Sequence, residues 1–279
     1  MKNKRFLYTN EQLVQAAASN PAFLQFKNPR DPRVLEAMRR VDRRDFLDDT
    51  MFPVRDPSDE SLAAIQLAED KLSGKSILAP GENDAKLIRI AAYAAFALIG
   101  SLRTFNVSPR ALAYNDQTFP IGHNQSCSKP SLIAFMDDVL EIERGYNVLE
   151  VGTGSGYHAA VTYELIGPDG KLTTVEVIPE LAEFGRMNLD KHTKTSGKVE
   201  VITGSGKTGY DRNAPYHRIY LTAGVNDDFS EEVFLEQLDR KNGALLYPDP
   251  TGFNLAVYRD GRLEKKRFEI GLSFVPLRP

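Results

Sequence analysis

The stretch NVLEVGTGSGY, residues 147–157, decides the fold predicted for this chain. Its NVLEV segment is short, apolar and rich in valine, as the buried strands of parallel sheets are. Glycines at every second position, Gly152, Gly154 and Gly156, follow the strand directly, and Tyr157 opens a helical pattern. Missing side chains let backbone N–H groups and a helix N-terminus come close to a ligand. The stretch therefore predicts a ligand-binding turn between a strand and a helix.

Strand and helix patterns alternate downstream of this turn. Further strands are predicted at 171–177, 199–203 and 217–223, and helices at 157–166 and 179–192. Such alternation is typical of a parallel sheet covered by helices. The tail LAVYRDGRLEKKRFEI alternates instead around Asp260-Gly261, a dipeptide that favours a tight hairpin turn. We expect an α/β fold whose doubly wound, mostly parallel sheet finishes with antiparallel strands.

The chain divides into three regions by pattern. Residues 1–52 form an N-terminal helical segment, in which Thr9 can cap EQLVQAAAS and Asp31-Pro32 supplies a cap and a first-turn proline. Residues 53–112 hold two more helical patterns and are predicted to be a helical insertion. Residues 113–279 are predicted to be the catalytic α/β domain.

Composition and charge exclude several classes of protein. Lys+Arg 35 against Asp+Glu 38 give a net charge of -3, so no overall basic field favours nucleic acid or an acidic membrane surface. The single cysteine, Cys127, excludes an intrachain disulfide, and the histidines show no metal-ligand spacing. The apolar run at 90–100 is shorter than the roughly 20 residues that span a bilayer, and no signal-peptide pattern is present. We expect a cytoplasmic protein with no metal, nucleic-acid or membrane partner, of open oligomeric state.

Two acidic residues accompany the glycine-rich turn. Its G-x-G-x-G spacing differs from the G-x-G-x-x-G fingerprint of dinucleotide sites, which makes a nicotinamide cofactor the weaker alternative. Glu150 precedes the turn and is placed to organise it, or to meet a cationic amino-acid group through water. Glu176, at the end of the next predicted strand, can accept both ribose hydroxyls of a nucleoside. These features favour S-adenosylmethionine, although a turn that serves packing alone is the simpler alternative.

Several stretches together resemble one family, the protein-L-isoaspartate (D-aspartate) O-methyltransferases. They are the glycine-rich turn, DPRVLEAMRRVDRRDFL (31–47), FPIGHNQSCSKPSLIAFMDDVLE (119–141), NAPYHRIYLTAG (213–224) and FVPL (274–277), and they occur in the family's order. The resemblance implies a Rossmann-like sheet of the S-adenosylmethionine-dependent methyltransferase type. It also implies added N-terminal helices and an altered strand order near the end of the sheet.

The resemblance implies a reaction as well. The family transfers a methyl group from S-adenosylmethionine to the α-carboxylate of an isoaspartyl residue in a damaged protein or peptide, and S-adenosylhomocysteine is left. Because that carboxylate is already ionised near neutral pH, the protein's main task is alignment in a site with little water. Ser128 corresponds to the family's active-site serine, and Ser126 stands where threonine is usual. From the residues alone, both serines could instead cap the helix that follows Pro130.

The remaining site residues follow from the same resemblance. The cofactor is expected at Glu150, Gly152, Thr153, Gly154, Ser155, Gly156, Glu176, Gly204, Ser205 and Gly206, and the substrate at His123, Gln125, Val275, Pro276 and Leu277. Ser205 replaces an acid that in the family accepts a hydrogen bond from adenine. Serine still accepts that bond, at a cost of about 1 kcal/mol. His123 has the alternative of a purely structural place in its loop.

The insertion and the altered motifs leave alternatives open. The family has only a short link where residues 53–112 stand here. We hypothesise that the insertion narrows the peptide entrance, and a dimerisation or stabilising element is an equal alternative. Two other functions also stay open: a related methyltransferase that esterifies a specific aspartate or other carboxylate in a dedicated peptide or small molecule, and a non-catalytic S-adenosylmethionine-binding module.

Overall fold

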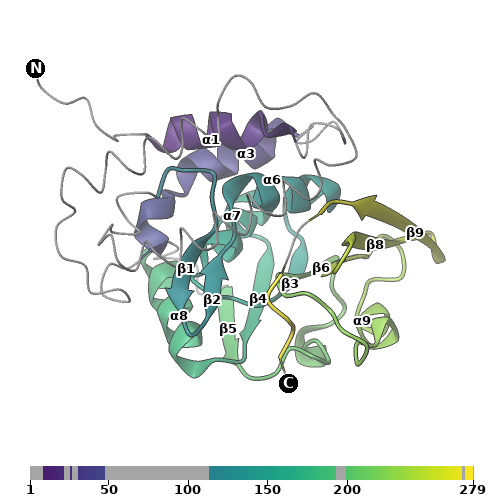
Figure 1. Ribbon diagram of the computed structural model, residues 1–279. Helices are drawn as coiled ribbons and strands as arrows, with labels where there is room; N and C mark the ends of the chain where they lie inside the picture. The colour runs from purple at the N-terminus through teal and green to yellow at the C-terminus, as the bar shows by residue number, and fades with distance from the viewer. Residues whose placement is uncertain are drawn as a thin grey trace, which may run out of the picture. The chain divides into compact units, whose positions relative to one another are not determined.

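A computed structural model of the chain describes residues 9–21, 26, 31–47, 113–192, 199–271 and 274–278 (Figure 1). Met1–Leu47 and Tyr114–Pro279 form one compact unit, and Asp48–Ala113 form a second. The predicted insertion at 53–112 lies outside the described residues, so its helices and its role as cap or dimerisation element stay predictions. None of the helices in the described ranges is long and apolar enough to cross a membrane.

The centre of the first unit is a seven-stranded sheet in the order β5-β4-β3-β6-β7-β8-β9. Its strands are β3 (Asn147–Val151), β4 (Lys171–Glu176), β5 (Val199–Thr203), β6 (Arg218–Leu221), β7 (Ala244–Asp249), β8 (Gly252–Arg259) and β9 (Arg262–Glu269). The strands from β5 to β7 are parallel, whereas β8 and β9 are antiparallel. The predicted α/β fold with a mostly parallel sheet is confirmed. The β8–β9 hairpin turns at Asp260 and Gly261, both with positive φ, as the dipeptide indicates.

The strand order reverses at β3. The chain runs from β3 through β4 to β5 on one side, returns to β6 on the other side of β3, and continues to β7. Open α/β sheets bind their ligands at the carboxyl ends of strands beside such a switch point. The glycine-rich turn follows β3 directly and therefore lies at this point.

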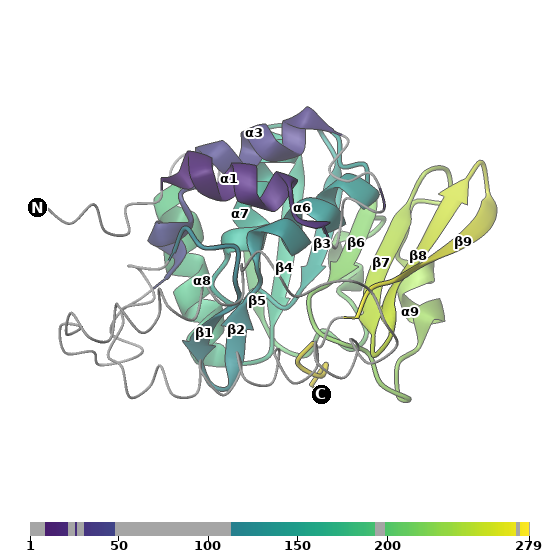
Figure 2. The same cartoon turned by 45° about the horizontal axis from the view of Figure 1, so that its top comes forward.

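Helices cover both faces of the sheet (Figures 1 and 2). They are α6 (Pro130–Val139), α7 (Tyr157–Ile166), α8 (Pro179–His192) and α9 (Glu231–Glu236). Because side chains of a strand alternate between faces, Leu149 and Val151 pack with Phe234 of α9. Glu150 points the other way, toward His158 of α7. The two faces thus differ: the first is an apolar core, and the second carries polar groups.

The N-terminal helices pack on this second face from outside. They are α1 (Asn10–Ala18), α3 (Pro32–Arg40) and the 3-10 turn η1 (Arg43–Phe46). The predicted caps are present: Thr9 forms a capping box at α1, and Asp31 accepts a backbone hydrogen bond ahead of Pro32 at α3. α1 packs against α6, and α3 against α7. A separate antiparallel hairpin, β1 (Phe119–Gly122) and β2 (Gln125–Cys127), leads into α6.

Candidate functional site

A crevice opens at the carboxyl ends of β3, β4 and β6. Its walls come from the turn after β3, from the ends of β4 and β6, from the β2 region and from the C-terminal segment. The lining residues are Ile121, Gln125, Ser126, Cys127, Ser128, Ile133, Val151, Gly152, Thr153, Gly154, Ser155, Tyr157, His158, Val175, Glu176, Val177, Ile178, Gly206, Thr222, Ala223, Val275, Pro276, Leu277 and Arg278. The space measures about 790 Å³ when the open solvent at its mouth is included.

The glycine-rich turn packs so tightly at Gly152 and Gly156 that an added β carbon would clash with neighbouring atoms. Gly152 has φ 101°, and a β carbon there would lie 2.2 Å from the Thr222 Oγ1 atom. That hydroxyl sits close because it donates to the carbonyl oxygens of Val151, at 3.0 Å, and of Gly152, at 2.9 Å. Gly156 has φ 82° and is the N-cap of α7, and a β carbon there would lie 3.0 Å from the Gly185 carbonyl oxygen. The glycines therefore keep the turn close to β6 and α8 and leave its outer side open.

Glu176 ends β4 beside the turn and holds it in place. Its carboxylate accepts the Gly154 N–H at 2.9 Å through Oε2 and the Ile178 N–H at 3.1 Å through Oε1. A carboxylate has about four acceptor positions, so each oxygen keeps one for a further donor. Only 6% of Glu176 is exposed, and it lines the crevice. The predicted ribose acceptor is thus aimed at the ligand space and fixed by two backbone groups.

Glu150 lies behind the turn rather than in the crevice. It is fully buried and stands in a row across three strands, with Thr174 beside it on β4 and Tyr220 beside it on β6. The Thr174 hydroxyl donates to Oε2 at 2.6 Å, and the Tyr220 hydroxyl donates to Oε1 at 3.2 Å. Thr174 also shares a 2.7 Å hydrogen bond with Thr153 of the turn. Of the two predicted roles of Glu150, organising the turn is the one that this geometry supports.

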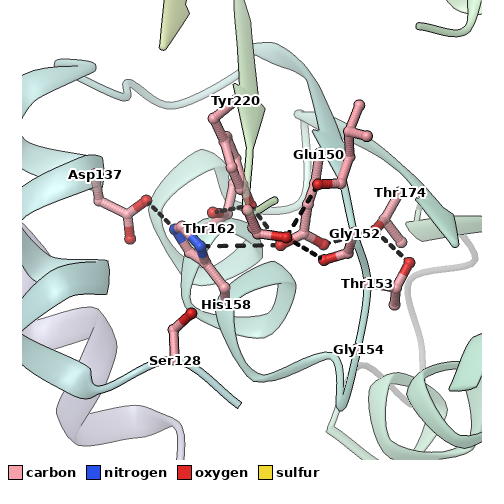
Figure 3. A network of polar contacts seen from close by, with 12 residues as sticks. Ser128, Asp137, Glu150, Gly152, Thr153, Gly154, His158, Thr162, Thr174 and Tyr220 are labelled. Carbon is pink, nitrogen blue, oxygen red and sulfur yellow. Dashed lines mark hydrogen bonds and ion pairs between the residues drawn. The ribbon is translucent and has the colours of Figure 1, made fainter. Parts of the chain in front are cut away.

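A buried histidine continues the row of polar groups toward α6 (Figure 3). The His158 Nε2 atom lies 2.9 Å from Asp137 Oδ1, and its Nδ1 atom lies 3.9 Å from Glu150 Oε1. The ring stacks on Tyr220 with 4.4 Å between centroids. The Ser128 side chain points toward this imidazole in Figure 3. The network therefore connects the crevice to α6 through His158. The sequence had suggested no role for this histidine.

The pKa values of three buried groups in this network, Asp137, Glu150 and His158, are all raised. Burial raises the pKa of Glu150 to about 7, against a smaller opposite effect from His158. Burial also raises the pKa of Asp137. The pKa of His158 is raised, because the nearby Asp137 and Glu150 carboxylates outweigh the desolvation that lowers it. Each of these shifts favours the protonated form of its group over the deprotonated form.

We expect the free energy of unfolding to fall as the pH rises from about 4.5 to about 7, because of the Glu150 carboxyl. A carboxyl whose pKa is 4.5 when unfolded and about 7 when folded binds its proton more tightly in the native state, so its contribution is lost between these values. In Glu150→Gln this group no longer titrates. Urea unfolding from pH 4.5 to 8 should show the variant gaining stability relative to wild type by on the order of 3 kcal/mol.

Glu180→Gln at an exposed position of α8 is the matched control, and we expect it to reproduce the wild-type pH profile. A Glu150→Gln profile parallel to that of wild type would mean that the buried carboxyl is ionised throughout.

Most of the residues predicted to contact substrate also line the crevice. Gln125, Ser126 and Ser128 come from β2 and the turn after it. The helix cap of α6 is Lys129, with no side-chain hydrogen bond, so the alternative in which the serines cap this helix is wrong. The C-terminal residues 275–277 close the crevice, held by the Gly224 N–H at 2.8 Å from the Val275 carbonyl oxygen and by the Leu277 N–H at 2.8 Å from the Gly224 carbonyl oxygen.

Most predicted site residues meet at the crevice, and a few do not. Those that line it are Gln125, Ser126, Ser128, Gly152, Thr153, Gly154, Ser155, Glu176, Gly206, Val275, Pro276 and Leu277. Those outside its lining are His123, Glu150, Gly156, Gly204 and Ser205. His123 is exposed at the β1–β2 turn with φ 50°, which fits its structural alternative. Ser205 is also exposed, and its hydroxyl accepts the Lys207 N–H at 3.4 Å.

Sequence reasoning missed several lining residues. Thr222 and Ala223 directly follow β6, and the rule that ligands lie at strand ends beside a switch point is the signal that could have found them. Tyr157 and His158 were visible as the first residues after the glycines. Arg278 follows the C-terminal stretch and lines the crevice with an exposed cationic side chain.

Comparison with known proteins places this site in context. Residues 95–277 match the family described as Protein-L-isoaspartate(D-aspartate) O-methyltransferase. The match begins inside the stretch predicted to be an insertion. Protein-L-isoaspartate O-methyltransferase of Methanopyrus kandleri is 44% identical over 173 residues, which cover 60% of this chain and 74% of that protein. Protein-L-isoaspartate O-methyltransferase 2 of Archaeoglobus fulgidus is 43% identical over 172 residues, covering 60% and 75%.

Solved structures agree on the fold. One, a protein-L-isoaspartate O-methyltransferase, superposes with a TM-score of 0.62 at 19% identity and covers 97% of this chain and 66% of that chain. Another, a putative protein-L-isoaspartate O-methyltransferase from Plasmodium falciparum in complex with S-adenosyl-L-homocysteine, has a TM-score of 0.61 at 14% identity and covers 97% and 99%. These likenesses confirm the Rossmann-like methyltransferase fold.

Proposed function

The chain belongs to the protein-L-isoaspartate(D-aspartate) O-methyltransferase family, and from this premise we propose where and how it acts. The enzyme uses S-adenosylmethionine to methylate isoaspartyl residues of proteins or peptides. We place the reaction in the crevice between Glu176 and Ser128. The observation that carries this assignment is that both side chains line one space, which the glycine-rich turn also lines.

The residues of the crevice fit an adenosyl group. Glu176 keeps free acceptor positions toward the ligand space, as two ribose hydroxyls require. Gly206 lines the crevice and packs so closely that a β carbon would lie 2.4 Å from the Val151 Cγ1 atom, so a larger residue at this edge of the ligand space would clash. Ser205 is the proposed acceptor for the adenine amino group. The predicted cofactor residues that line the crevice support this ligand, whereas Glu150, Gly156, Gly204 and Ser205 lie outside its lining. The role proposed for Glu150 is to support the turn.

The chain's own residues need to supply little acid or base chemistry. When bound, S-adenosylmethionine supplies an activated methyl group on a sulfonium sulfur. The accepting carboxylate is ionised near neutral pH, so no general base has to remove a proton from it. In this proposal Ser128 donates a hydrogen bond that orients the carboxylate, and residues 275–277 form part of the wall of the space. Ser126, exposed beside it, contacts the peptide in the same proposal.

Ser128→Ala is expected to lower kcat/KM for an isoaspartyl peptide about tenfold. This is the effect of one hydrogen bond to a charged acceptor at the weaker end of its usual range. The affinity for S-adenosylhomocysteine should stay within about twofold of wild type, because the cofactor residues are untouched. Steady-state kinetics and calorimetry measure the two quantities. Ser230→Ala, at the start of α9, is the control, and unchanged kcat/KM in Ser128→Ala would remove Ser128 from the mechanism.

A direct assay separates the proposed activity from its alternatives. The protein is incubated with methyl-labelled S-adenosylmethionine and a peptide that carries either isoaspartate or aspartate at one position. We expect base-labile label on the isoaspartyl peptide alone. Label on only the aspartyl form of one peptide would favour a dedicated aspartyl methyltransferase. Cofactor binding without transfer to either peptide or to aged protein would favour the non-catalytic alternative.

We also propose a class of substrate, a cellular location and a role for the insertion. The substrate is a protein or peptide with isoaspartate. The cytoplasmic location, the absence of nucleic-acid and membrane partners, and the cap at residues 53–112 stay predictions.

A further inference from the structure

Arg43 is a cation buried at the base of the substrate-side wall. It belongs to η1, and its side chain is 0% exposed. Removing a guanidinium from water is costly unless its donors are satisfied and the charge is accommodated. A buried arginine in a short N-terminal turn therefore requires partners from elsewhere in the chain.

Those partners are backbone groups of the segment that leads to the active-site serine. Nη1 donates to the Asn115 carbonyl oxygen at 2.9 Å, and Nη2 donates to the Gln117 carbonyl oxygen at 2.7 Å. Nη2 also donates to the carbonyl oxygen of Ser128 itself at 2.9 Å and lies 3.8 Å from the Cys127 Sγ atom. The guanidinium thus joins both ends of the β1–β2 hairpin and fixes the backbone from which the Ser128 hydroxyl projects.

The same guanidinium reaches the cofactor side of the crevice. Its central carbon lies 4.9 Å from the Phe119 ring centroid and 5.7 Å from the Tyr157 ring centroid. Both distances are within the range of cation–π attraction. Tyr157 is the first residue of α7, directly after Gly156, and it lines the crevice. Arg43 therefore contacts the backbone at Ser128 and the first residue of the helix that follows the glycine-rich turn.

We propose that Arg43 is a positioning residue for methyl transfer, which sets the separation between Ser128 and the glycine-rich turn. The proposal rests on the proposed function, because it assumes that the acceptor carboxylate meets Ser128 and the methyl donor lies at the turn. A reaction that depends on alignment is sensitive to displacements of about an ångström, even when they originate away from the reacting atoms. Arg43 touches neither reactant and acts through Ser128 and Tyr157.

Lysine cannot reproduce this arrangement. Arginine presents five N–H donors in a planar fork and stacks on aromatic rings, whereas lysine concentrates its charge and three donors at one atom. The partners of Arg43 are spread over three carbonyl groups and two rings. Arg43→Lys keeps the charge and loses the fork, so it tests geometry rather than charge.

The test compares full-length wild type, Arg43→Lys and Arg44→Lys. Arg44 is the next residue of η1 and is exposed, which makes it the matched control. We expect Arg43→Lys to lower kcat with an isoaspartyl peptide about tenfold or more. Its Kd for S-adenosylhomocysteine and its KM for peptide should stay within about threefold of wild type. Arg44→Lys should match wild type in all three quantities. Circular dichroism confirms that each protein is folded at the assay temperature.

Other outcomes overturn the proposal. An unchanged kcat in Arg43→Lys means that the fork does not set the alignment. A loss of cofactor affinity in proportion to the loss of kcat means that Arg43 only supports the fold. If Arg43→Lys does not fold, Phe119→Leu removes one ring and leaves the hydrogen bonds, and kcat should then fall about threefold; no change in kcat refutes the proposal. If wild type and Arg44→Lys transfer no methyl group at all, the proposed function fails first and this proposal fails with it.

Discussion

Glu176→Ala is expected to weaken the binding of S-adenosylhomocysteine by about 100-fold or more. The substitution removes the proposed acceptor of two ribose hydroxyls, and hydrogen bonds to a charged group contribute about 1.5–3 kcal/mol each. It also releases the Gly154 and Ile178 N–H groups that the carboxylate holds at 2.9 and 3.1 Å. A loss of about 3 kcal/mol corresponds to roughly 150-fold in Kd. Isothermal titration calorimetry measures it.

Two further variants separate the causes of this loss. Glu176→Gln keeps one acceptor oxygen and similar size, so its affinity should fall between those of wild type and Glu176→Ala. Glu180→Ala removes an exposed carboxylate a few residues further along and should bind like wild type. Wild-type affinity in Glu176→Ala would show that the cofactor's sugar lies elsewhere.

Gly152→Ala is expected to abolish measurable cofactor binding and to lower the free energy of unfolding. Its β carbon would lie 2.2 Å from the Thr222 Oγ1 atom, and the φ of 101° is one that alanine rarely adopts. Overpacking costs about 1–3 kcal/mol, and an unfavourable backbone conformation costs a similar amount. The clash is relieved if the turn moves into the ligand space or if the Thr222 hydroxyl gives up its hydrogen bonds to the turn. Urea denaturation and calorimetry with S-adenosylhomocysteine report the two effects.

The chain offers matched controls for both components. Gly145 has φ 81° with no atom within 4 Å of an added β carbon, so Gly145→Ala carries the backbone strain without the clash. We expect it to lose some stability and to keep its cofactor affinity. Adding Thr222→Ala to Gly152→Ala removes the obstructing hydroxyl and should recover part of the stability. If Gly152→Ala binds cofactor as wild type does, the turn does not form the cofactor wall.

The local elements of the fold could be predicted because their signals lie within a few residues of one another. The strand at 147–151, the helices at 157–166 and 179–192 and the hairpin at Asp260-Gly261 all appear at the expected positions. Each depends on side-chain period, caps or turn residues that act over short range. The strand, glycine-rich turn and helix at 147–166 were therefore visible from the sequence.

The orientation of Glu150 was less visible. Its place beside the glycines suggested a position at the ligand, but strand alternation points it to the face opposite Leu149 and Val151, under α6 and α7. A parallel strand with helices on both faces has no exposed side, so a carboxyl within it must be buried. Its partners Thr174 and Tyr220 come from neighbouring strands whose register the sequence alone does not give.

Contacts between distant segments could not be predicted at all. Arg43 meets Ser128 across 85 positions, and Thr222 meets Gly152 across 70. Nothing in the local pattern of an N-terminal turn indicates that its arginine will bind the backbone at Ser128. Resemblance to a family placed Ser128 and Glu176 at one site, whereas only the structure shows what holds them there.

A crystal structure of the protein with S-adenosylhomocysteine and an isoaspartyl peptide tests the central assignment most directly. We predict the ribose hydroxyls on the Glu176 carboxylate, the amino-acid chain along Gly152–Gly156, and the sulfur facing the peptide carboxylate beside Ser128. A nucleoside bound away from Glu176, or a peptide whose carboxylate lies far from Ser128 with the sulfur turned from it, would contradict the account.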